Sequence, residues 1–496
     1  MVPTLLSTLH LVPRDGVIAL ASLVGLGALV GLGEVMRARG VAAHTTRRLV
    51  HMGVALFVAA TPLLFTGPLP VYGLAIVFTL LNAGARARQA WAGIHEARPR
   101  SWGTVAMPLS VLPALVVTWS VTPDRLLAFQ IAYLVLALAD PTASWVGERT
   151  GSDTSAQGST LAGSVAFAGV TFAITASMLA GIAGLPSVVV VGTAVGTTLV
   201  ATLVEAISHR GWDNFFIVAA VLLVLVPLQE QAVRLVPFAI ALGVGGVFGG
   251  LAYGANALDG RGAVTGGLFA ASLVGLGGGP WIVPGVVFFA LSSALTSMDG
   301  QRLSLSEESP RRTQGQVLAN GGVAWAALAV AALVPGARLC GYVAFVGALA
   351  AAAADTWATE LGAWSPSPPW SLRDGQRVPS GTSGAVSVVG TGAAALGATS
   401  VVGAALLTNG PFVGPPGWNA AILIGAGLVG MGADSLAGAF LEAQYRAPAA
   451  EVPVEMPSSK ETTPVRGWSG IGNNVVNLIC TAVGAATALA GVLLLG

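Results

Sequence analysis

Long apolar stretches, each close to the length of a membrane-spanning helix, constrain this chain more than any other feature. A helix that crosses the hydrocarbon core of a bilayer needs ~20 apolar residues, and the sequence offers about 16 candidates. The expected spans are residues 16–36, 49–65, 69–81, 103–120, 126–147, 161–181, 185–207, 215–228, 233–253, 263–276, 281–298, 317–334, 339–354, 384–408, 419–441 and 475–495. The sequence therefore predicts an all-α, polytopic transmembrane helical bundle.

The chain has too little charge to cover the surfaces of several soluble domains. Only 9% of its 496 residues are charged, against roughly 25% in soluble proteins. The 54% hydrophobic content excludes disorder, and a net charge of +1 gives no support for nucleic-acid binding. Cys340 and Cys480 are too few for a disulfide framework or a zinc site.

Basic residues predict the orientation of these spans. With the N-terminus outside, all but Arg14, Arg125, Arg234 and Arg338 of the 23 Lys and Arg residues fall on one side. The positive-inside rule makes that side cytoplasmic. We therefore expect a multi-pass protein of the cytoplasmic (inner) membrane, with residues 442–470 forming a cytoplasmic loop that carries Lys460.

Polar residues near span ends form two similar series. Such residues are costly inside a membrane and indicate function. The first half contains Arg47 and Arg48 before a span, Asp140, the loop 158–164, Glu205 at the end of a span, and Asp213 and Asn214 at the start of the next. The second half contains Arg311 and Arg312 before a span, Asn320, Asp355, Glu360, the loop Gly381-Thr382-Ser383-Gly384, Asp434, and Asn473 and Asn474.

Both series share the pattern Ala-Asp-x-x-Ala-[Ser/Thr]-x-x-Gly, followed by a Gly/Ser/Thr loop that we expect to start a helix. Eight expected spans in each half would give the halves one orientation. We interpret the two series as a parallel duplication, with domains 1–231 and 232–496. Chance similarity in a chain rich in Ala and Gly is the alternative.

The chemistry of the two series is coherent. Carboxylates with amide and hydroxyl oxygens suit Mg²⁺, which takes one or two carboxylates plus substrate phosphates. A Gly/Ser/Thr loop at a helix start presents backbone N–H groups to an anion, and paired arginines bind phosphate. Phosphoryl transfer needs mainly positioning and charge neutralisation. The residues therefore indicate a metal–nucleotide site at the cytoplasmic face, although no soluble kinase motif is present.

The second half resembles the phytyl-phosphate kinase family, a widespread family of membrane proteins, from about residue 260 to the C-terminus. The similar stretches are 316–321 (QVLANG), 354–362 (ADTWATELG), 378–384 (VPSGTSG), 434–439 (DSLAGA) and 473–477 (NNVVN). This chain departs from the family at Glu442, where Gln is usual, and at Thr296-Ser297, where Thr-Lys is common.

The first half resembles the phytol kinase and dolichol kinase family. The similar stretches are 47–53 (RRLVHMG), the Asp140-Pro141 motif up to Gly147, and 205–214 (EAISHRGWDN). The family continues with Lys-Thr-x-Glu-Gly-Ser after the Asp-Pro motif, whereas this chain has Ser159-Thr160-Leu161-Ala162-Gly163-Ser164. The Lys and the Glu are both missing.

The two resemblances together imply an isoprenoid kinase that uses Mg²⁺ and CTP or a related nucleotide. It would convert an isoprenoid (phytyl) monophosphate to the diphosphate, and the alcohol to the monophosphate if the first half is active. The roles implied in the second half are metal and nucleotide binding by Asp355, Glu360 and Asp434, phosphate binding by Gly381, Thr382, Ser383 and Gly384, charge neutralisation by Arg311 and Arg312, and polar support by Asn320, Asn473 and Asn474. In the first half, Arg48, Asp140, Glu205 and Asp213 would catalyse the alcohol step or bind the isoprenoid.

Three other functions compete with this one. A cytidylyltransferase would make a CDP-activated lipid, but the His-Gly-Gly-x-x-Asp-Arg type of signature is absent. A transporter with two parallel repeats should place its polar residues at the midplane of the membrane. In a mixed case, the second half is catalytic and the first half is structural or delivers substrate, which the missing Lys and Glu favour.

Overall fold

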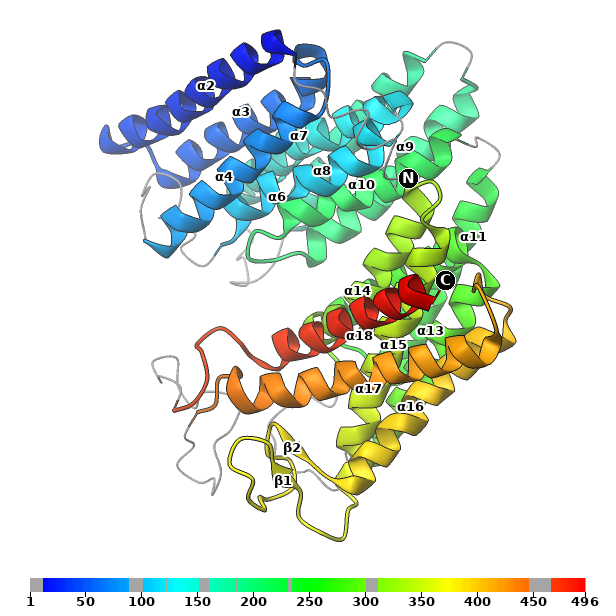
Figure 1. Ribbon diagram of the computed structural model, residues 1–496. Helices are drawn as coiled ribbons and strands as arrows, with labels where there is room; N and C mark the ends of the chain where they lie inside the picture. The colour runs from blue at the N-terminus through cyan, green and yellow to red at the C-terminus, as the bar shows by residue number, and fades with distance from the viewer. Residues whose placement is uncertain are drawn as a thin grey trace. The chain divides into compact units, whose positions relative to one another are not determined.

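The computed structural model describes residues 12–88, 101–121, 123–150, 160–182, 185–230, 234–299, 311–445 and 465–495. These residues are almost entirely helical (Figure 1). The α-helices are α2 (Pro13–Ala38), α3 (Ala43–Leu64), α4 (Leu69–Ala87), α6 (Gly103–Leu115), α7 (Leu126–Arg149), α8 (Leu161–Ala180), α9 (Ser187–Ile207), α10 (Asp213–Glu230), α11 (Leu235–Gly254), α12 (Gly260–Ser272), α13 (Gly279–Asp299), α14 (Gln314–Leu333), α15 (Arg338–Gly362), α16 (Val388–Leu407), α17 (Pro416–Phe440) and α18 (Asn473–Leu495). The strands β1 (Trp370–Ser371) and β2 (Ala385–Val386) form a two-residue antiparallel pair.

The prediction of an all-α polytopic bundle is confirmed. Each predicted span corresponds to one α-helix of the described residues, and 14 of these helices are long and apolar enough to cross a membrane. The other two are shorter. In α10 the apolar part is Asp213–Leu228, and α12 has 13 residues before the π-helical turn η4 (Leu273–Gly277) continues it. A further π-helical turn, η1 (Val116–Ser120), extends α6, and the 3₁₀ turn η2 (Pro123–Arg125) precedes α7.

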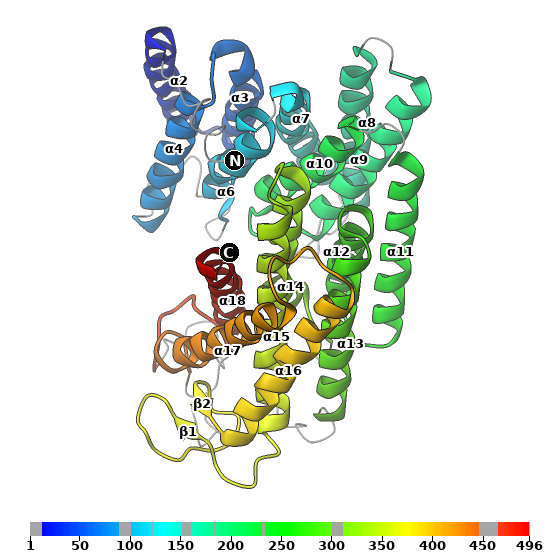
Figure 2. The same ribbon diagram turned by 45° about the vertical axis from the view of Figure 1, so that its right-hand side comes forward.

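The chain separates into two compact units. Unit 1 comprises residues 1–239 with 333–335, and unit 2 comprises 240–332 with 336–496. Each contains about half of the helices that can span a membrane. Figure 2 shows α8, α9 and α10 of unit 1 as neighbouring, steeply inclined rods.

Several helix boundaries differ from the predicted ones. α15 ends at Gly362, eight residues beyond the predicted end, so Asp355 and Glu360 lie inside the helix. α3 begins at Ala43, so Arg47 and Arg48 lie in its first turns and do not precede it. The predicted ends stopped at the first charged residue, but Ala, Thr, Trp, Glu and Leu all continue a helix without strain.

Side-chain caps begin three of the helices. Thr160, Asp259 and Ser387 each accept a hydrogen bond from the backbone N–H three residues later, at 3.0, 2.6 and 2.9 Å. These bonds satisfy donors that the first turn of a helix leaves without partners. The caps fix the first residues of α8, α12 and α16.

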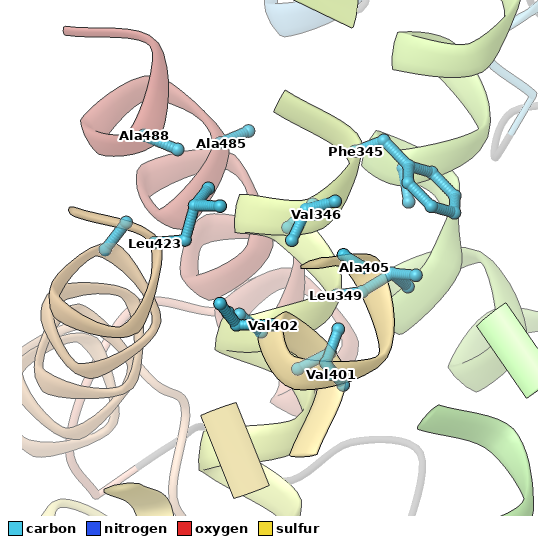
Figure 3. Packing of buried hydrophobic residues seen from close by; sticks show 14 of the residues in the cluster. Phe345, Val346, Leu349, Val401, Val402, Ala405, Leu423, Ala485 and Ala488 are labelled. Carbon is cyan, nitrogen blue, oxygen red and sulfur yellow. The ribbon is translucent and has the colours of Figure 1, made fainter. Parts of the chain in front are cut away.

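The core of unit 2 surrounds α15. Figure 3 shows Phe345, Val346 and Leu349 of α15 among side chains from α16, α17 and α18. Residues 348–354 of α15 are all buried, and six of the seven are alanines. Small residues allow the neighbouring helices to approach closely: a Cβ on Gly347 would lie 2.5 Å from Ala488 Cβ and 2.8 Å from Gly484 O. This is the kind of packing that associates helices in a membrane.

Candidate functional site

Two carboxylates meet inside unit 2. Asp355 on α15 and Asp434 on α17 lie within hydrogen-bonding reach of one another. One helical turn before these carboxylates lie Ala351 on α15 and Gly430 on α17. A Cβ on Gly430 would lie 2.5 Å from Ala351 Cβ, so the two backbones run close together at this level. The absence of a side chain at Gly430 therefore brings the carboxylates together.

The thiol of Cys480 on α18 lies near this acid pair. It is close enough to interact electrostatically with both Asp355 and Asp434, and it donates to Ala351 O at 3.7 Å. Among the described residues, no group of three or more His, Cys, Asp and Glu side chains is arranged to hold a metal ion. The protein thus supplies two carboxylates, which is the number that Mg²⁺ takes when substrate phosphates complete its ligands.

Glu360 does not join the acid pair, although we predicted one set of three carboxylates. Two side chains that are five residues apart on an α-helix point in directions about 140° apart. Glu360 and Asp355 therefore lie on different sides of α15. Glu360 instead accepts a hydrogen bond from Thr296 Oγ1 of α13 at 2.7 Å. The joint role of the three carboxylates in binding metal and nucleotide therefore stays a prediction, with Glu360 placed on a different side of α15 from Asp355.

Arg312 completes this second cluster. Its Nη2 donates to Thr296 Oγ1 at 3.0 Å and to Ser292 O at 3.3 Å. Burial lowers the pKa of Arg312, while the charge of Glu360 raises it. Thr296 therefore links a half-buried guanidinium to a carboxylate. The sequence singled out Thr296 only as half of a departure from the family pattern.

Arg311 and Arg312 do not act as a pair. Arg311 donates to Asn256 Oδ1 and lies over the ring of Tyr253, with its guanidinium carbon 5.3 Å from the ring centroid. Adjacent residues in the extended segment before α14 point in different directions. The prediction that both arginines bind one phosphate group is therefore not supported by their placement.

The loop of Gly381, Thr382, Ser383 and Gly384 does not open a helix directly. α16 begins at Val388 and is capped by Ser387. Thr382 Oγ1 donates to Pro379 O at 2.7 Å, and Ser383 Oγ donates to a carboxylate oxygen of Glu442. We expected the loop to start the helix, but β2 intervenes between them. The corresponding loop of unit 1 does open its helix, through the Thr160 cap of α8.

Gly384 anchors this loop to the end of α17. It has φ +72°, and a Cβ there would lie 2.4 Å from Ala439 N. Glu442 is buried, with 3% of its surface exposed. Burial raises the pKa of Glu442, and the hydrogen bond from Ser383 lowers it. Glu442 thus lies against the loop of Gly381 to Gly384, although the sequence identified it only as a departure from the family.

The predicted asparagines lie at different depths. Asn320 Oδ1 accepts from Asn477 Nδ2 at 3.4 Å, which links α14 to α18. Thr481 Oγ1 donates to Ala319 O at 3.2 Å and strengthens the same contact. Asn473 and Asn474 begin α18 and are exposed. Asn477 lies in the stretch 473–477, but it was not predicted to be a partner of Asn320. A single sequence does not show which helices are neighbours.

Unit 1 brings its three predicted carboxylates into one region. Glu205 on α9 accepts from Ser164 Oγ at 3.2 Å and lies within electrostatic range of Asp140 and Asp213. His51 Nε2 lies 3.6 Å from Asp140 Oδ2 and 3.0 Å from Leu136 O. His51 therefore borders the carboxylate group.

Arg48 faces a different part of α7. Its Nε donates to Ser144 Oγ at 3.2 Å, and its Nη2 forms an ion pair with Glu148. One turn before His51, Arg47 donates from Nη2 to Ser101 Oγ at 3.0 Å. The first helical turns of α3 therefore direct one basic group toward the end of α7 and the other toward Ser101.

An apolar cleft of unit 1 adjoins these polar groups. Its open space is about 620 Å³. The polar residues of its lining include Arg47, His51, Asn82 and Asn214. A second hollow of about 380 Å³ has a mainly apolar lining and shares Leu26, Val54, Phe78, Met107 and Pro108 with the first. The two form one groove with a polar end.

The predicted loop 442–470 lies mainly outside the described residues, as do Lys460 and Ser159. At the base of this loop, Gln444 and Arg466 pair through backbone hydrogen bonds, with Gln444 N donating to Arg466 O at 2.9 Å.

Comparison with known proteins shows a similarity in the second half of the chain. Residues 243–485 match the model of a family described as integral membrane protein DUF92. No curated protein and no solved structure matches the chain. The matched range contains both carboxylates of the acid pair, the Arg312–Thr296–Glu360 cluster and the Ser383–Glu442 contact. The described residues include 14 helices that are able to span a membrane. Together with the family match, they identify the protein as a multi-span integral membrane protein that is similar to family DUF92 over residues 243–485.

Proposed function

We propose that the protein is a membrane-embedded, nucleotide-dependent kinase that converts an isoprenoid (phytyl) monophosphate to the diphosphate, with the reaction in unit 2. CTP or a related nucleoside triphosphate is the donor. The γ-phosphoryl group passes to a phosphate oxygen of the lipid: the bond between the β- and γ-phosphoryl groups breaks, a new P–O–P linkage forms, and the nucleoside diphosphate leaves.

The acid pair carries this proposal. Two carboxylates within hydrogen-bonding reach repel one another unless a proton or a cation lies between them. Asp355 and Asp434 are therefore suited to hold Mg²⁺ together with nucleotide phosphates, which are the ligands that this ion prefers. When bound, Mg²⁺ would neutralise charge on the transferred phosphoryl group.

The second cluster supports the same reaction. Arg312 is a half-buried cation held by Thr296, Ser292 and the charge of Glu360. A guanidinium fixed in this way is suited to binding a phosphate. Its side chain is already ordered in the folded protein, so it loses little conformational entropy when the phosphate binds. The acceptor is an anionic phosphate, so the chemistry requires charge screening more than a general base.

The groove of unit 1 supports binding of an isoprenoid chain there. A largely apolar groove with Arg47, His51 and Asn214 at one end suits a lipid with a hydroxyl or phosphate head. The missing Lys and Glu favour binding over catalysis in this unit.

Purified protein in detergent with Mg²⁺ tests the proposal. CTP, UTP and ATP are each offered with phytyl monophosphate and, separately, with phytol. We expect diphosphate from the monophosphate, lowered about 10²–10³-fold in Asp355→Asn and in Asp434→Asn, as for the loss of one group that stabilises transition-state charge. Asp374→Asn, an exposed carboxylate of unit 2, is the matched control and should keep wild-type activity.

Other outcomes would assign a different function. Release of pyrophosphate with formation of a CDP-lipid would indicate a cytidylyltransferase. Absence of transfer from all three donors would contradict the kinase. Transport then becomes the second candidate, because Asp355 and Asp434 lie inside helices that can span the membrane. Intramembrane carboxylates commonly mark ion pathways.

A further inference from the structure

Unit 1 contains buried hydroxyl groups without hydrogen-bond partners among the described residues. They include Thr104 on α6 and Thr197 on α9, and a set of four that is made up of Thr171 and Thr175 on α8 and Thr198 and Thr202 on α9. Thr171 and Thr175 are fully buried, at 0% exposure. Neither the carboxylate region nor the groove described above includes any of these four hydroxyls.

These hydroxyls differ from other threonine hydroxyls of the protein. A threonine inside a helix usually donates to the carbonyl of the preceding turn. Thr118 does so to Ala114 O at 2.7 Å, and Thr356 to Ala352 O at 2.9 Å. The four hydroxyls of α8 and α9 do not, so they are turned away from the backbone of their own helices.

Helix periodicity places all four on the sides where α8 and α9 meet. Ser164 on α8 donates to Glu205 on α9, and this contact marks the facing sides of the two helices. Thr171 and Thr175 follow Ser164 by seven and eleven residues, within about 20° of the same direction. Thr198 and Thr202 precede Glu205 by seven and three residues, within about 60°.

The hydroxyls also form a regular series in depth. α8 and α9 are joined by a short connection and run in opposite directions, so both series lead away from the Ser164–Glu205 contact. At a rise of ~1.5 Å per residue, Thr202 lies ~4.5 Å from this contact, Thr171 and Thr198 ~10.5 Å, and Thr175 ~16.5 Å. Successive levels are therefore ~4.5–6 Å apart, about twice the length of one hydrogen bond.

We propose that α8 and α9 enclose a file of bound water molecules that leads along these threonines to Glu205. Two hydroxyls that are bridged by a single water molecule lie about two hydrogen-bond lengths apart. A buried water needs two to four polar partners. The file satisfies the four hydroxyls and connects the Glu205 carboxylate to the interior of the unit by hydrogen bonds. It thereby gives protons a route along the span to and from Glu205, whatever reaction unit 2 performs.

Replacing threonine with the isosteric valine tests the file. If the hydroxyls are dry, Thr171→Val with Thr175→Val removes two unsatisfied groups and stabilises the protein. If they bind water, the same change removes water bridges and destabilises it. We expect Tm to fall by about 2–4 °C, the shift that one lost interaction produces in a unit of this size. Thr118→Val, which loses only a backbone-directed bond within the same unit, calibrates the isosteric change.

A second measurement detects the water itself. Hydroxyl radicals made from bound water by a short X-ray pulse label neighbouring side chains, even where bulk solvent has no access. We expect labelling of the peptide that contains residues 161–182 in the wild type and its loss in the Thr171→Val, Thr175→Val double variant. A rise in Tm of the double variant, or labelling that this variant retains, would overturn the proposal.

Discussion

At the scale of single residues, the structure separates side chains that look equivalent in the sequence. Arg311 and Arg312 are neighbours in the chain, yet one contacts Tyr253 and the other donates to Thr296. Glu442 stands where the family pattern has Gln, so a carboxylate replaces an amide of the same shape. This carboxylate is buried and accepts one hydrogen bond from Ser383. The environment of each side chain, more than its type, therefore determines what it can do.

Glu442→Gln should make the protein more stable at neutral pH. Burial raises the pKa of Glu442 above its usual value of 4.5. The contribution of this group to the free energy of unfolding is therefore fully present below pH 4.5 and is lost as the pH rises through the raised pKa. A neutral amide oxygen still accepts from Ser383 without that loss. Thermal unfolding between pH 4 and 8 should show Tm of the variant about 2–4 °C above wild type at pH 8, with the difference vanishing near pH 4. An equal difference at every pH would contradict this explanation.

Two glycines of the loop before α16 provide a matched pair. Gly381 and Gly384 both have positive φ, +85° and +72°, but only Gly384 has close neighbours. Gly381→Ala should cost roughly 1–2 kcal/mol, the strain of a left-handed conformation. Gly384→Ala should cost more, because its Cβ would also meet Ala439 N at 2.4 Å. Equal losses in a denaturation experiment would show that the contact with α17 is absent.

At the scale of helices, Thr296 connects three elements. It lies on α13, accepts from Arg312 just before α14, and donates to Glu360 near the end of α15. A hydrogen bond to a charged group contributes ~1.5–3 kcal/mol, and more is lost when a buried charge is left without a partner. This small cluster therefore fixes the ends of the three helices relative to one another.

Thr296→Val should loosen this cluster. The change removes both hydrogen bonds and keeps the volume of the side chain. We expect a loss of about 2–4 kcal/mol in the free energy of unfolding and, under the proposed function, a lower rate of diphosphate formation. Thr296→Ser retains the hydroxyl and should preserve most of both. If valine and serine behave alike in unfolding and activity assays, the hydroxyl has no bridging role.

The helices themselves were predictable from the sequence, whereas the clusters were predictable only in part. Apolar length identified every span, because a bilayer requires ~20 such residues and soluble loops do not supply them. The meeting of Asp355 and Asp434 depends on a close approach at Gly430 and Ala351, which no local pattern reveals. Glu360 was grouped with Asp355 because the two are near in the chain, but helical rotation turns them apart.

At the scale of the whole molecule, the two units carry different kinds of site. Unit 2 has an acid pair with a separate arginine cluster, and unit 1 has three carboxylates beside His51 and an apolar groove. The family match falls within unit 2. The order of motifs along both halves predicts a duplication, and this stays a prediction.

Asp140→Asn should therefore leave the second phosphorylation in place. Under the proposed function, the variant converts phytyl monophosphate to the diphosphate at a rate close to that of wild type, because Asp140 belongs to unit 1. Any conversion of phytol to the monophosphate would be lost. Product analysis by mass spectrometry with each substrate separates the two activities. Loss of diphosphate formation in Asp140→Asn would show that the units share one reaction.

The alanine-rich interior of α15 has a consequence for synthesis. In the window of α15 that is apolar enough to span a membrane, 78% of the residues are buried by other helices, and α16, α17 and α18 follow α15 in the chain. As the ribosome releases α15, this segment enters the membrane with Asp355 before Asp434 has been translated. Assembly of unit 2 is therefore completed only when α18, which follows α16 and α17 in the chain, has docked against α15.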